Sequence, residues 1–171
     1  MKKIKFFADC QTAEELKKAF HKLAMKFHPD NGGDGEAFKA MKAEFEMLFD
    51  LLKNVHRRKD GETWEATGEK ATTETAAEFM DIIEKVMFID NLTVELCGSW
   101  VWVGGETKKY KDYLKENGFK YSANKKMWYY QRDGVRKWHK KAWSITEIRD
   151  TYGSEVYKGS RKVLDVEKET A

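Results

Sequence analysis

Hydrophobic and polar positions follow the period of an α-helix in two stretches near the start of the chain. In residues 13–27, at about 100° per residue, one side of the helix collects Leu16, Ala19, Phe20, Leu23, Ala24 and Phe27. In the second stretch the apolar residues recur at spacings of three and four, at Phe38, Met41, Phe45, Leu48 and Leu52. Two amphipathic helices joined by a short loop bury their apolar stripes by packing antiparallel. The pattern therefore predicts a helical hairpin.

The pattern changes after residue 58. Residues 59–74 are polar, rich in Gly, Thr and Glu, and lack periodicity, which predicts a linker. Residues 75–143 then read as helix, two strands, helix, two strands, with "LTVELC" and "WVWV" joined by a two-residue turn at Gly98-Ser99 and "FKYS" and "MWYYQ" joined across 123–126. Trp100 and Trp102 share one face of their strand, opposite Val101 and Val103.

The predicted fold class is α+β, in four parts. They are an all-α helical hairpin in residues 1–58, an acidic linker in 59–74, a small basic and aromatic α+β module in 75–143, and a short helix with a loose charged tail in 144–171. Helix starts are marked by capping boxes, in which a Ser or Thr is followed three residues later by Glu. These pairs are Thr12/Glu15, Thr75/Glu78 and Ser144/Glu147.

Composition favours a soluble protein with a packed core. Hydrophobic residues make up 41% of the chain and charged residues 36%, and the mean hydropathy is −0.76. No apolar run approaches the roughly 20 residues that span a bilayer, and the basic start is not a signal peptide, so we expect a cytoplasmic location. The two cysteines, Cys10 and Cys97, lie far apart. They indicate buried free thiols, with a disulfide left open, and we expect no metal and no cofactor.

Charge is distributed unevenly along the chain. Residues 1–59 carry 13 basic and 9 acidic side chains, residues 60–99 carry 2 and 10, and residues 100–171 carry 17 and 10. The net charges of these segments are therefore +4, −8 and +7. Such alternation indicates separate modules with an acidic stretch between them.

The only proline, Pro29, lies between His28 and Asp30 at the tip of the predicted hairpin. It ends the first helix, because it moves the preceding residue out of the α region, and it restricts the backbone that presents the imidazole and the carboxylate. The polar side of that helix carries Lys17, Lys18, His21, Lys22 and Lys26. A preorganised carboxylate beside a basic stripe suits docking onto a partner of mixed charge.

The stretch "TAEELKKAFHKLAMKFHPDNGGDGEAFKAMKAEFEML" resembles the J domain of DnaJ-type co-chaperones. The resemblance covers residues 6–52 and rests on the paired aromatics Phe6-Phe7, the basic helix, His28-Pro29-Asp30 and Phe38. The short loop is similar to those of polyomavirus T antigens and mitochondrial import-motor J proteins. Two isolated cysteines cannot supply the zinc units of full-length DnaJ, so the resemblance is to a specialised J protein.

The resemblance implies a co-chaperone that is not itself an enzyme. It would dock on the ATPase domain of a DnaK-type chaperone, stimulate its ATP hydrolysis and direct it to a target chosen by the C-terminal module. Asp30 would pair with a cationic group near the chaperone's interdomain linker, with His28 and Pro29 holding that geometry. The acidic face of the ATPase domain would meet Lys17, Lys18, Lys22 and Lys26. His21 stands where relatives often have a base, and Asn31 stands where long-loop relatives have one.

Residues 117–141 support an alternative function, nucleic-acid binding. Eight Lys or Arg residues, one acid and several aromatics lie there, and cations that track phosphates beside rings that stack on bases suit a single strand. Strand alternation favours a core role for about half of the aromatics, and a third possibility is that the module grips a protein client. "GFKYSANKKMWYY" loosely resembles modules of phage and mobile-element proteins. The candidate nucleic-acid residues are Lys120, Lys125, Lys126, Trp128, Tyr130, Arg132, Arg136 and Lys137.

Overall fold

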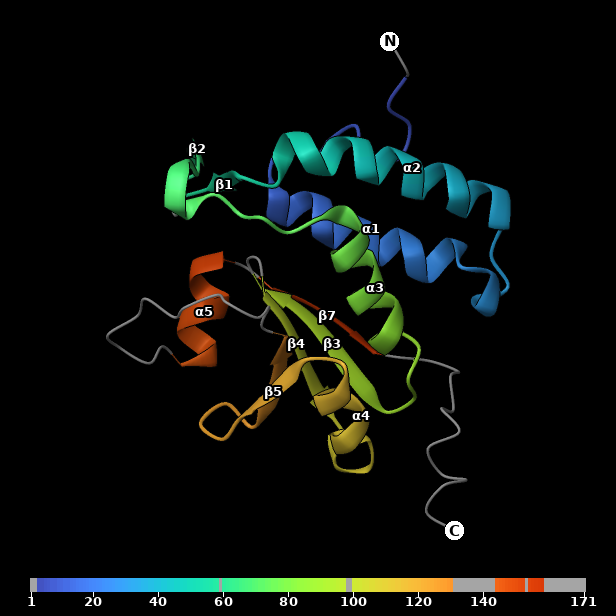
Figure 1. Ribbon diagram of the computed structural model, residues 1–171, viewed down its shortest axis with the longest axis vertical. Helices are drawn as coiled ribbons and strands as arrows, with labels where there is room; N and C mark the ends of the chain where they lie inside the picture. Colours follow the sequence, from blue (N-terminus) through green and yellow to red (C-terminus); the bar gives the residue numbers. More distant parts are fainter. Residues whose placement is uncertain (1–2, 59, 98–99, 131–143, 153, 159–171) are drawn as a thin grey trace. The chain divides into compact units, whose positions relative to one another are not determined.

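The computed structural model describes residues 3–58, 60–97, 100–130, 144–152 and 154–158 (Figure 1). Contacts divide the chain into two compact units, residues 1–83 and residues 84–171. Among the described helices, none combines the length and the apolar character that crossing a bilayer requires.

The first unit is built on the predicted helical hairpin. Helices α1 (Ala13–Phe27) and α2 (Gly35–Leu52) run antiparallel (Figure 1). Thr12 caps α1 by accepting the Glu15 amide at 3.3 Å, and the Asp34 side chain accepts two amides at the start of α2. In the first capping box the Glu15 carboxylate accepts from the amide of Gln11 instead of Thr12. The boxes at Thr75 and Ser144 are reciprocal, as predicted.

A third helix, α3 (Ala76–Val86), completes the core of the first unit. Its Phe79 ring is 1% exposed and lies 6.0 Å from the ring centroid of Phe20, 5.7 Å from that of Phe45 and 6.5 Å from that of Phe49. The sequence placed this helix at the opening of the second module. Because it buries Phe79 among the rings of α1 and α2, most of its length belongs to the first unit instead.

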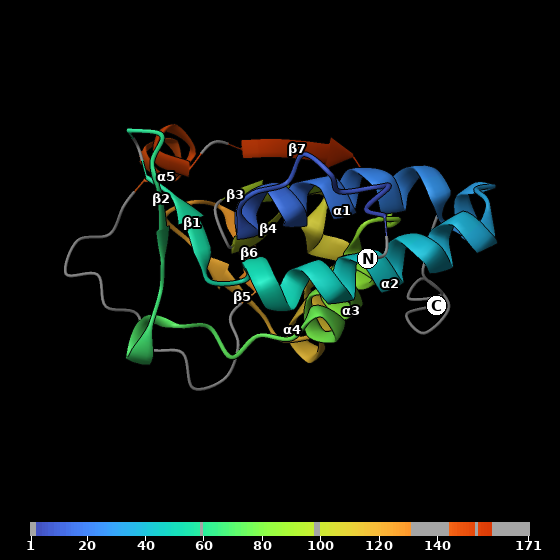
Figure 2. The same cartoon turned by 90° about the horizontal axis from the view of Figure 1, so that it is seen from above.

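The region expected to be an irregular linker contains a β-hairpin. Strands β1 (Val55–Arg57) and β2 (Thr63–Glu65) pair antiparallel, and a 3₁₀ turn, η2, follows at Gly68–Lys70. Figure 2 shows the hairpin at the end of the unit where α1 begins and α2 ends. Two side-chain contacts fix it there: His56 Nδ1 lies 2.6 Å from Glu14 Oε1, and Arg57 donates to Glu15 at 2.7 Å.

The second unit is an antiparallel sheet of five strands in the order β5-β6-β4-β3-β7. The two predicted hairpins are present, although the turn at Gly98-Ser99 lies outside the described residues. One strand was missed, because β7 occupies part of the expected loose tail and pairs with β3. The strands are β3 (Leu92–Cys97), β4 (Trp100–Gly105), β5 (Phe119–Ser122), β6 (Met127–Tyr130) and β7 (Ser154–Lys158).

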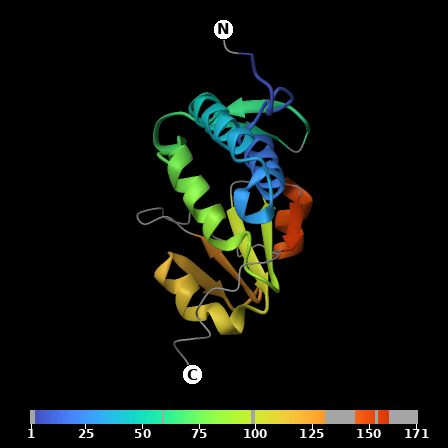
Figure 3. The ribbon, with the colours of Figure 1, turned by 90° about the vertical axis from the view of Figure 1, so that its right-hand side faces the viewer.

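Helices lie on both faces of this sheet. A 3₁₀ turn η3 (Thr107–Tyr110) leads into α4 (Lys111–Glu116), and α5 (Ile145–Tyr152) follows later in the chain. Figure 3 shows α4, in gold, and α5, in orange-red, on opposite sides of the strands. On the α5 side, Ile145 and Ile148 pack against a cluster of Cys97, Trp102 and Tyr129.

An ion pair anchors α5 to the sheet. The Glu95 carboxylate on β3 is 1% exposed and accepts two hydrogen bonds from the Arg149 guanidinium, at 2.6 and 2.7 Å. These hydrogen bonds raise the pKa of Arg149 above its usual value, although burial opposes the shift. A bidentate partner offsets the cost of burying the carboxylate.

Candidate functional site

The turn at Pro29 follows directly from the local sequence. His28 adopts an extended backbone (φ −63°, ψ 133°), as the residue before a proline should, and α1 ends at Phe27. Pro29 opens a 3₁₀ turn, η1 (Pro29–Asn31), at a position where its missing N–H costs no hydrogen bond. His28 Nδ1 accepts the Asp30 amide at 3.1 Å, so the imidazole caps the turn. The Asp30 side chain is 53% exposed.

Contacts on either side of this turn hold it in place. The His28 ring packs edge-on against Phe38 of α2, with the centroids 4.8 Å apart. Asn31 donates from Nδ2 to the Met25 carbonyl at 2.8 Å, which ties the turn back to the last turn of α1. Asn31, which the sequence placed on the binding surface, is exposed and also has this structural contact.

Two glycines let the chain pass from η1 into α2. Gly32 has a left-handed backbone with φ +75°, which glycine adopts without steric cost. At Gly33 a Cβ atom would lie 2.3 Å from the carbonyl carbon of Phe27, so no larger residue fits without moving the backbone. The backbone that carries Asp30 can therefore adopt few other conformations, and the direction of its carboxylate is largely fixed.

The basic face of α1 is narrower than the sequence suggested. Lys18 is half-buried and Lys22 and Lys26 are exposed, and their spacing of four residues sets them in one row along the helix. Lys17 and His21 were expected on the same face, but both are buried, at 3% and 0% exposed. The buried stripe of α1 is rotated towards them because α3 packs there in addition to α2.

The burial of Lys17 is compensated by a specific partner. Its ammonium lies 2.6 Å from Glu74 Oε2 and over the ring of Phe79, 4.9 Å from the centroid. Burial lowers the pKa of His21 from 6.5 to about 4, so its imidazole is neutral near pH 7. Neither side chain therefore presents a positive charge on the surface of α1.

The paired aromatics at the start of the chain are positioned by a residue that the sequence analysis missed. Glu44 Oε1 on α2 accepts the amides of Phe6 and Phe7 at 2.7 and 2.9 Å, and Lys5 also donates to this carboxylate. Phe7 is buried against Phe45, and Phe6 lies against Phe27, with the centroids 5.9 Å apart in both pairs. No local pattern could reveal a partner 37 to 39 positions away.

The candidate nucleic-acid residues of the second unit separate into different environments. Lys120 and Lys126 are exposed, whereas Lys125 lies over Trp102 on the α5 side of the sheet. Trp128 was expected to stack on a base, but it is only 6% exposed and belongs to the hydrophobic core of the second unit. Tyr130 is half-buried. Three further candidates, Arg132, Arg136 and Lys137, lie outside the described residues.

The thiols and the acidic groups of the described residues form neither a disulfide nor a metal-binding cluster. Cys10 and Cys97 are free thiols, and Cys10 is only partly buried. Burial, followed by the charges of Glu15, Asp9 and Glu44, raises the pKa of Cys10 to about 11. Within the described ranges, no three His, Cys, Asp or Glu side chains are placed to hold a metal ion.

Comparison with known proteins finds relatives of the N-terminal region. A chaperone protein DnaJ of Acetobacter pasteurianus is 45% identical over 47 residues, which are 28% of this chain and 12% of the relative. DnaJ homolog subfamily B member 9 of Cricetulus griseus is 45% identical over 49 residues (29% and 22%), and DnaJ protein homolog 2 of Allium porrum is 52% identical over 42 residues (25% and 10%).

These matches are short relative to the proteins that contain them. The chain spans between about a tenth and about a fifth of the length of these curated relatives. No family model and no solved structure matches the chain. The resemblance of the C-terminal part to phage and mobile-element modules stays a prediction.

Proposed function

Because the N-terminal region of this chain is a J-domain segment of the DnaJ type, we propose that it docks on the ATPase domain of a DnaK-type chaperone and stimulates ATP hydrolysis there. The chain would act as a co-chaperone rather than as an enzyme. The second unit, which has no counterpart in these matches, would choose where the chaperone acts.

The geometry of the Pro29 turn is the observation that carries this proposal. The Asp30 carboxylate is exposed at the tip of the hairpin, while its own amide is fixed by His28 Nδ1 at 3.1 Å. Because the turn is ordered before binding, little conformational entropy remains to be lost on docking. His28 acts through its backbone contact with Asp30 and is a positioning residue.

The row of Lys18, Lys22 and Lys26 supplies the electrostatic part of the interface. These lysines lie on α1 just before the turn. When they bind an acidic surface of the chaperone, Asp30 is brought close to the cationic group on the chaperone with which it would pair. Lys17 and His21 are left out of the proposed contact, because one is paired with Glu74 and the other is neutral and buried. The docking face is thus a line of three lysines ending at one carboxylate.

Single-turnover ATP hydrolysis by a purified bacterial DnaK-type chaperone tests the proposal. The intact chain should accelerate hydrolysis, and Asp30→Asn and His28→Gln should abolish the acceleration while the helical circular dichroism is unchanged. Asp50→Asn, the same change at an exposed site on α2, serves as the matched control and should stimulate like the parent. An Asp30→Asn variant that stimulates fully would refute the role of this carboxylate.

Lys22→Ala should weaken docking more at low salt than at high salt. Lys22 is exposed, and at about 0.15 M salt interactions between exposed charges are screened beyond roughly 8 Å. Equal weakening at both salt concentrations would contradict an electrostatic role for the lysine row.

A further inference from the structure

The second unit has a basic edge that the J-domain segment does not explain. It consists of Lys111 and Lys115 on α4, Lys120 and Tyr121 on β5, and Lys126 in the turn between β5 and β6. All five side chains are exposed, and Tyr121 is 52% exposed. Within the described ranges, none of the four lysines forms an ion pair.

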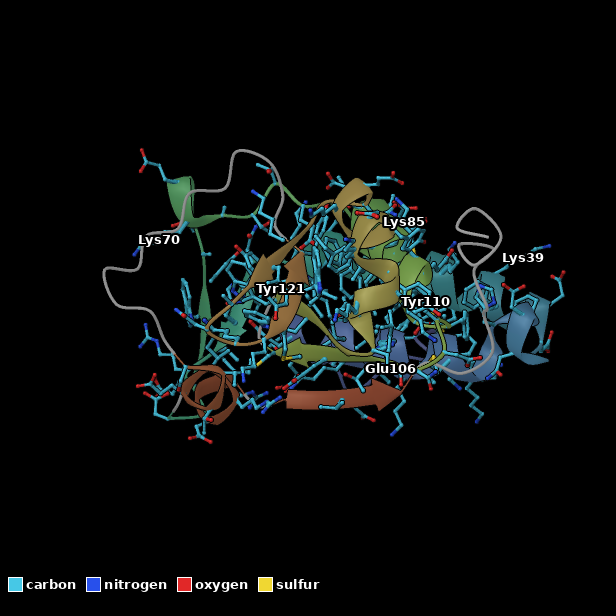
Figure 4. The ribbon with its side chains drawn as sticks, turned by 90° about the horizontal axis from the view of Figure 1, so that it is seen from below. Lys39, Lys70, Lys85, Glu106, Tyr110 and Tyr121 are labelled. Atoms are coloured by element: carbon cyan, nitrogen blue, oxygen red, sulfur yellow. The ribbon has the colours of Figure 1, made fainter. Side chains whose placement is uncertain are left out.

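Helix geometry places Lys111 and Lys115 on the β5 side of α4. Tyr113, on the same helix, donates its hydroxyl to the Lys85 carbonyl in the last turn of α3 at 3.1 Å. At about 100° per residue, Lys111 and Lys115 project on the side of the helix opposite Tyr113, and α4 contacts β5, an edge strand of the sheet. Figure 4 shows Lys85 and Tyr121 on different sides of α4. The acids Asp112 and Glu116 lie about 100° further round the helix.

Tyr121 is held in position although half of it is exposed. Strand register pairs it with Trp128, and the two ring centroids lie 5.4 Å apart. Trp128 is buried and supports one side of the tyrosine ring. An aromatic ring fixed in this way loses little freedom when a planar group stacks on its open side.

We infer that the basic edge binds single-stranded nucleic acid, with Lys111, Lys115 and Lys126 along the phosphates and Tyr121 stacked on a base. Lys120 pairs in register with Tyr129 and therefore points to the other face of β5, where it adds positive charge without lying beside the ring. Charge complementarity favours this occupant, because exposed cations near an exposed ring match a polyanion that carries flat bases. An acidic polypeptide would use the lysines but has no need of the ring. This inference concerns the second unit and does not depend on chaperone docking.

Fluorescence anisotropy of the full chain with a fluorescein-labelled oligothymidylate tests the inference. Binding should weaken with salt, with a slope of about −0.7 for each phosphate contact. Tyr121→Ala should weaken binding about 5- to 150-fold, the range seen when a stacking ring is removed, and Tyr121→Phe should restore it. Lys111→Glu with Lys115→Glu should weaken binding and lower the slope, whereas Lys39→Glu with Lys70→Glu, the same charge change on the first unit, should change neither.

Each remaining outcome overturns the inference. Absence of binding does so directly, and equal losses from both double variants would show that only net charge matters. Equal affinity of Tyr121→Ala and the parent would remove the stacking role. Tighter binding of a labelled poly-glutamate peptide than of the oligonucleotide would assign the edge to an acidic polypeptide partner.

Discussion

Replacing Phe79 by Ala tests whether α3 is part of the folding unit that presents the docking turn. The ring is 1% exposed and contacts rings from both helices of the hairpin, and the Lys17 ammonium lies 4.9 Å from its centroid. Truncation of a buried Phe to Ala costs about 3–5 kcal/mol. Aromatic pairs are worth about 0.5–1.5 kcal/mol each beyond buried area. Because Phe79 loses three such pairs, we expect a loss in the free energy of unfolding near the top of the range for such truncations, about 4–5 kcal/mol.

Urea unfolding of the full chain, followed by far-ultraviolet circular dichroism, measures this loss. In a thermal scan the same change should lower the midpoint of the first unit by roughly 16–40 °C, since 1 kcal/mol corresponds to about 4–8 °C in a domain of this size. Leu51→Ala is the control. It removes an apolar side chain that is 69% exposed on α2, and we expect a change within about 0.5 kcal/mol. A loss below about 1 kcal/mol for Phe79→Ala would refute the reasoning and restore the boundary near residue 75.

Two further predictions concern the residues around the docking turn. The fold keeps His21 neutral, with a pKa of about 4 against 6.5 when exposed; stability should therefore be full above about pH 6.5 and decline by roughly 3 kcal/mol as the pH falls to about 4. His21→Leu should remove that part of the pH dependence in urea titrations, and an unchanged profile would contradict it. Gly33→Ala forces a Cβ against Phe27, so it should lower the free energy of unfolding by about 1–3 kcal/mol and abolish ATPase stimulation. Asn tolerates the left-handed backbone of position 32, so Gly32→Asn should keep both the stability and the stimulation of the parent.

The sequence was sufficient where the determinants are local. The bounds of α1 follow from Thr12 and Pro29, and the hairpin of β5 and β6 follows from alternation around a turn. The capping boxes predicted at Thr75 and Ser144 also form, because each residue's amide donates to the glutamate three positions later. Each of these depends on residues within a few positions of one another, so a pattern along the chain contains the whole signal.

The sequence was insufficient where a distant segment decides the outcome. The helical period predicts Lys17 on the polar side of α1, but Glu74, 57 positions away, makes its burial tolerable. His21 was misplaced for the same reason. The amphipathic pattern of α1 shows that one face is buried, but it does not show that α3 packs beside α2 and buries part of the polar face as well. Strand β7 is a short edge strand whose pairing with β3 depends on residues about 60 positions earlier.

The carboxylate of Glu44 has a consequence for the order in which the chain becomes structured during synthesis. The amides of residues 5–7 find their acceptor on α2. Residues 5–7 therefore cannot reach their native hydrogen bonds until the middle of that helix has emerged from the ribosome. Residues 5–7 precede both helices in the sequence but are ordered only once α2 can supply their acceptor.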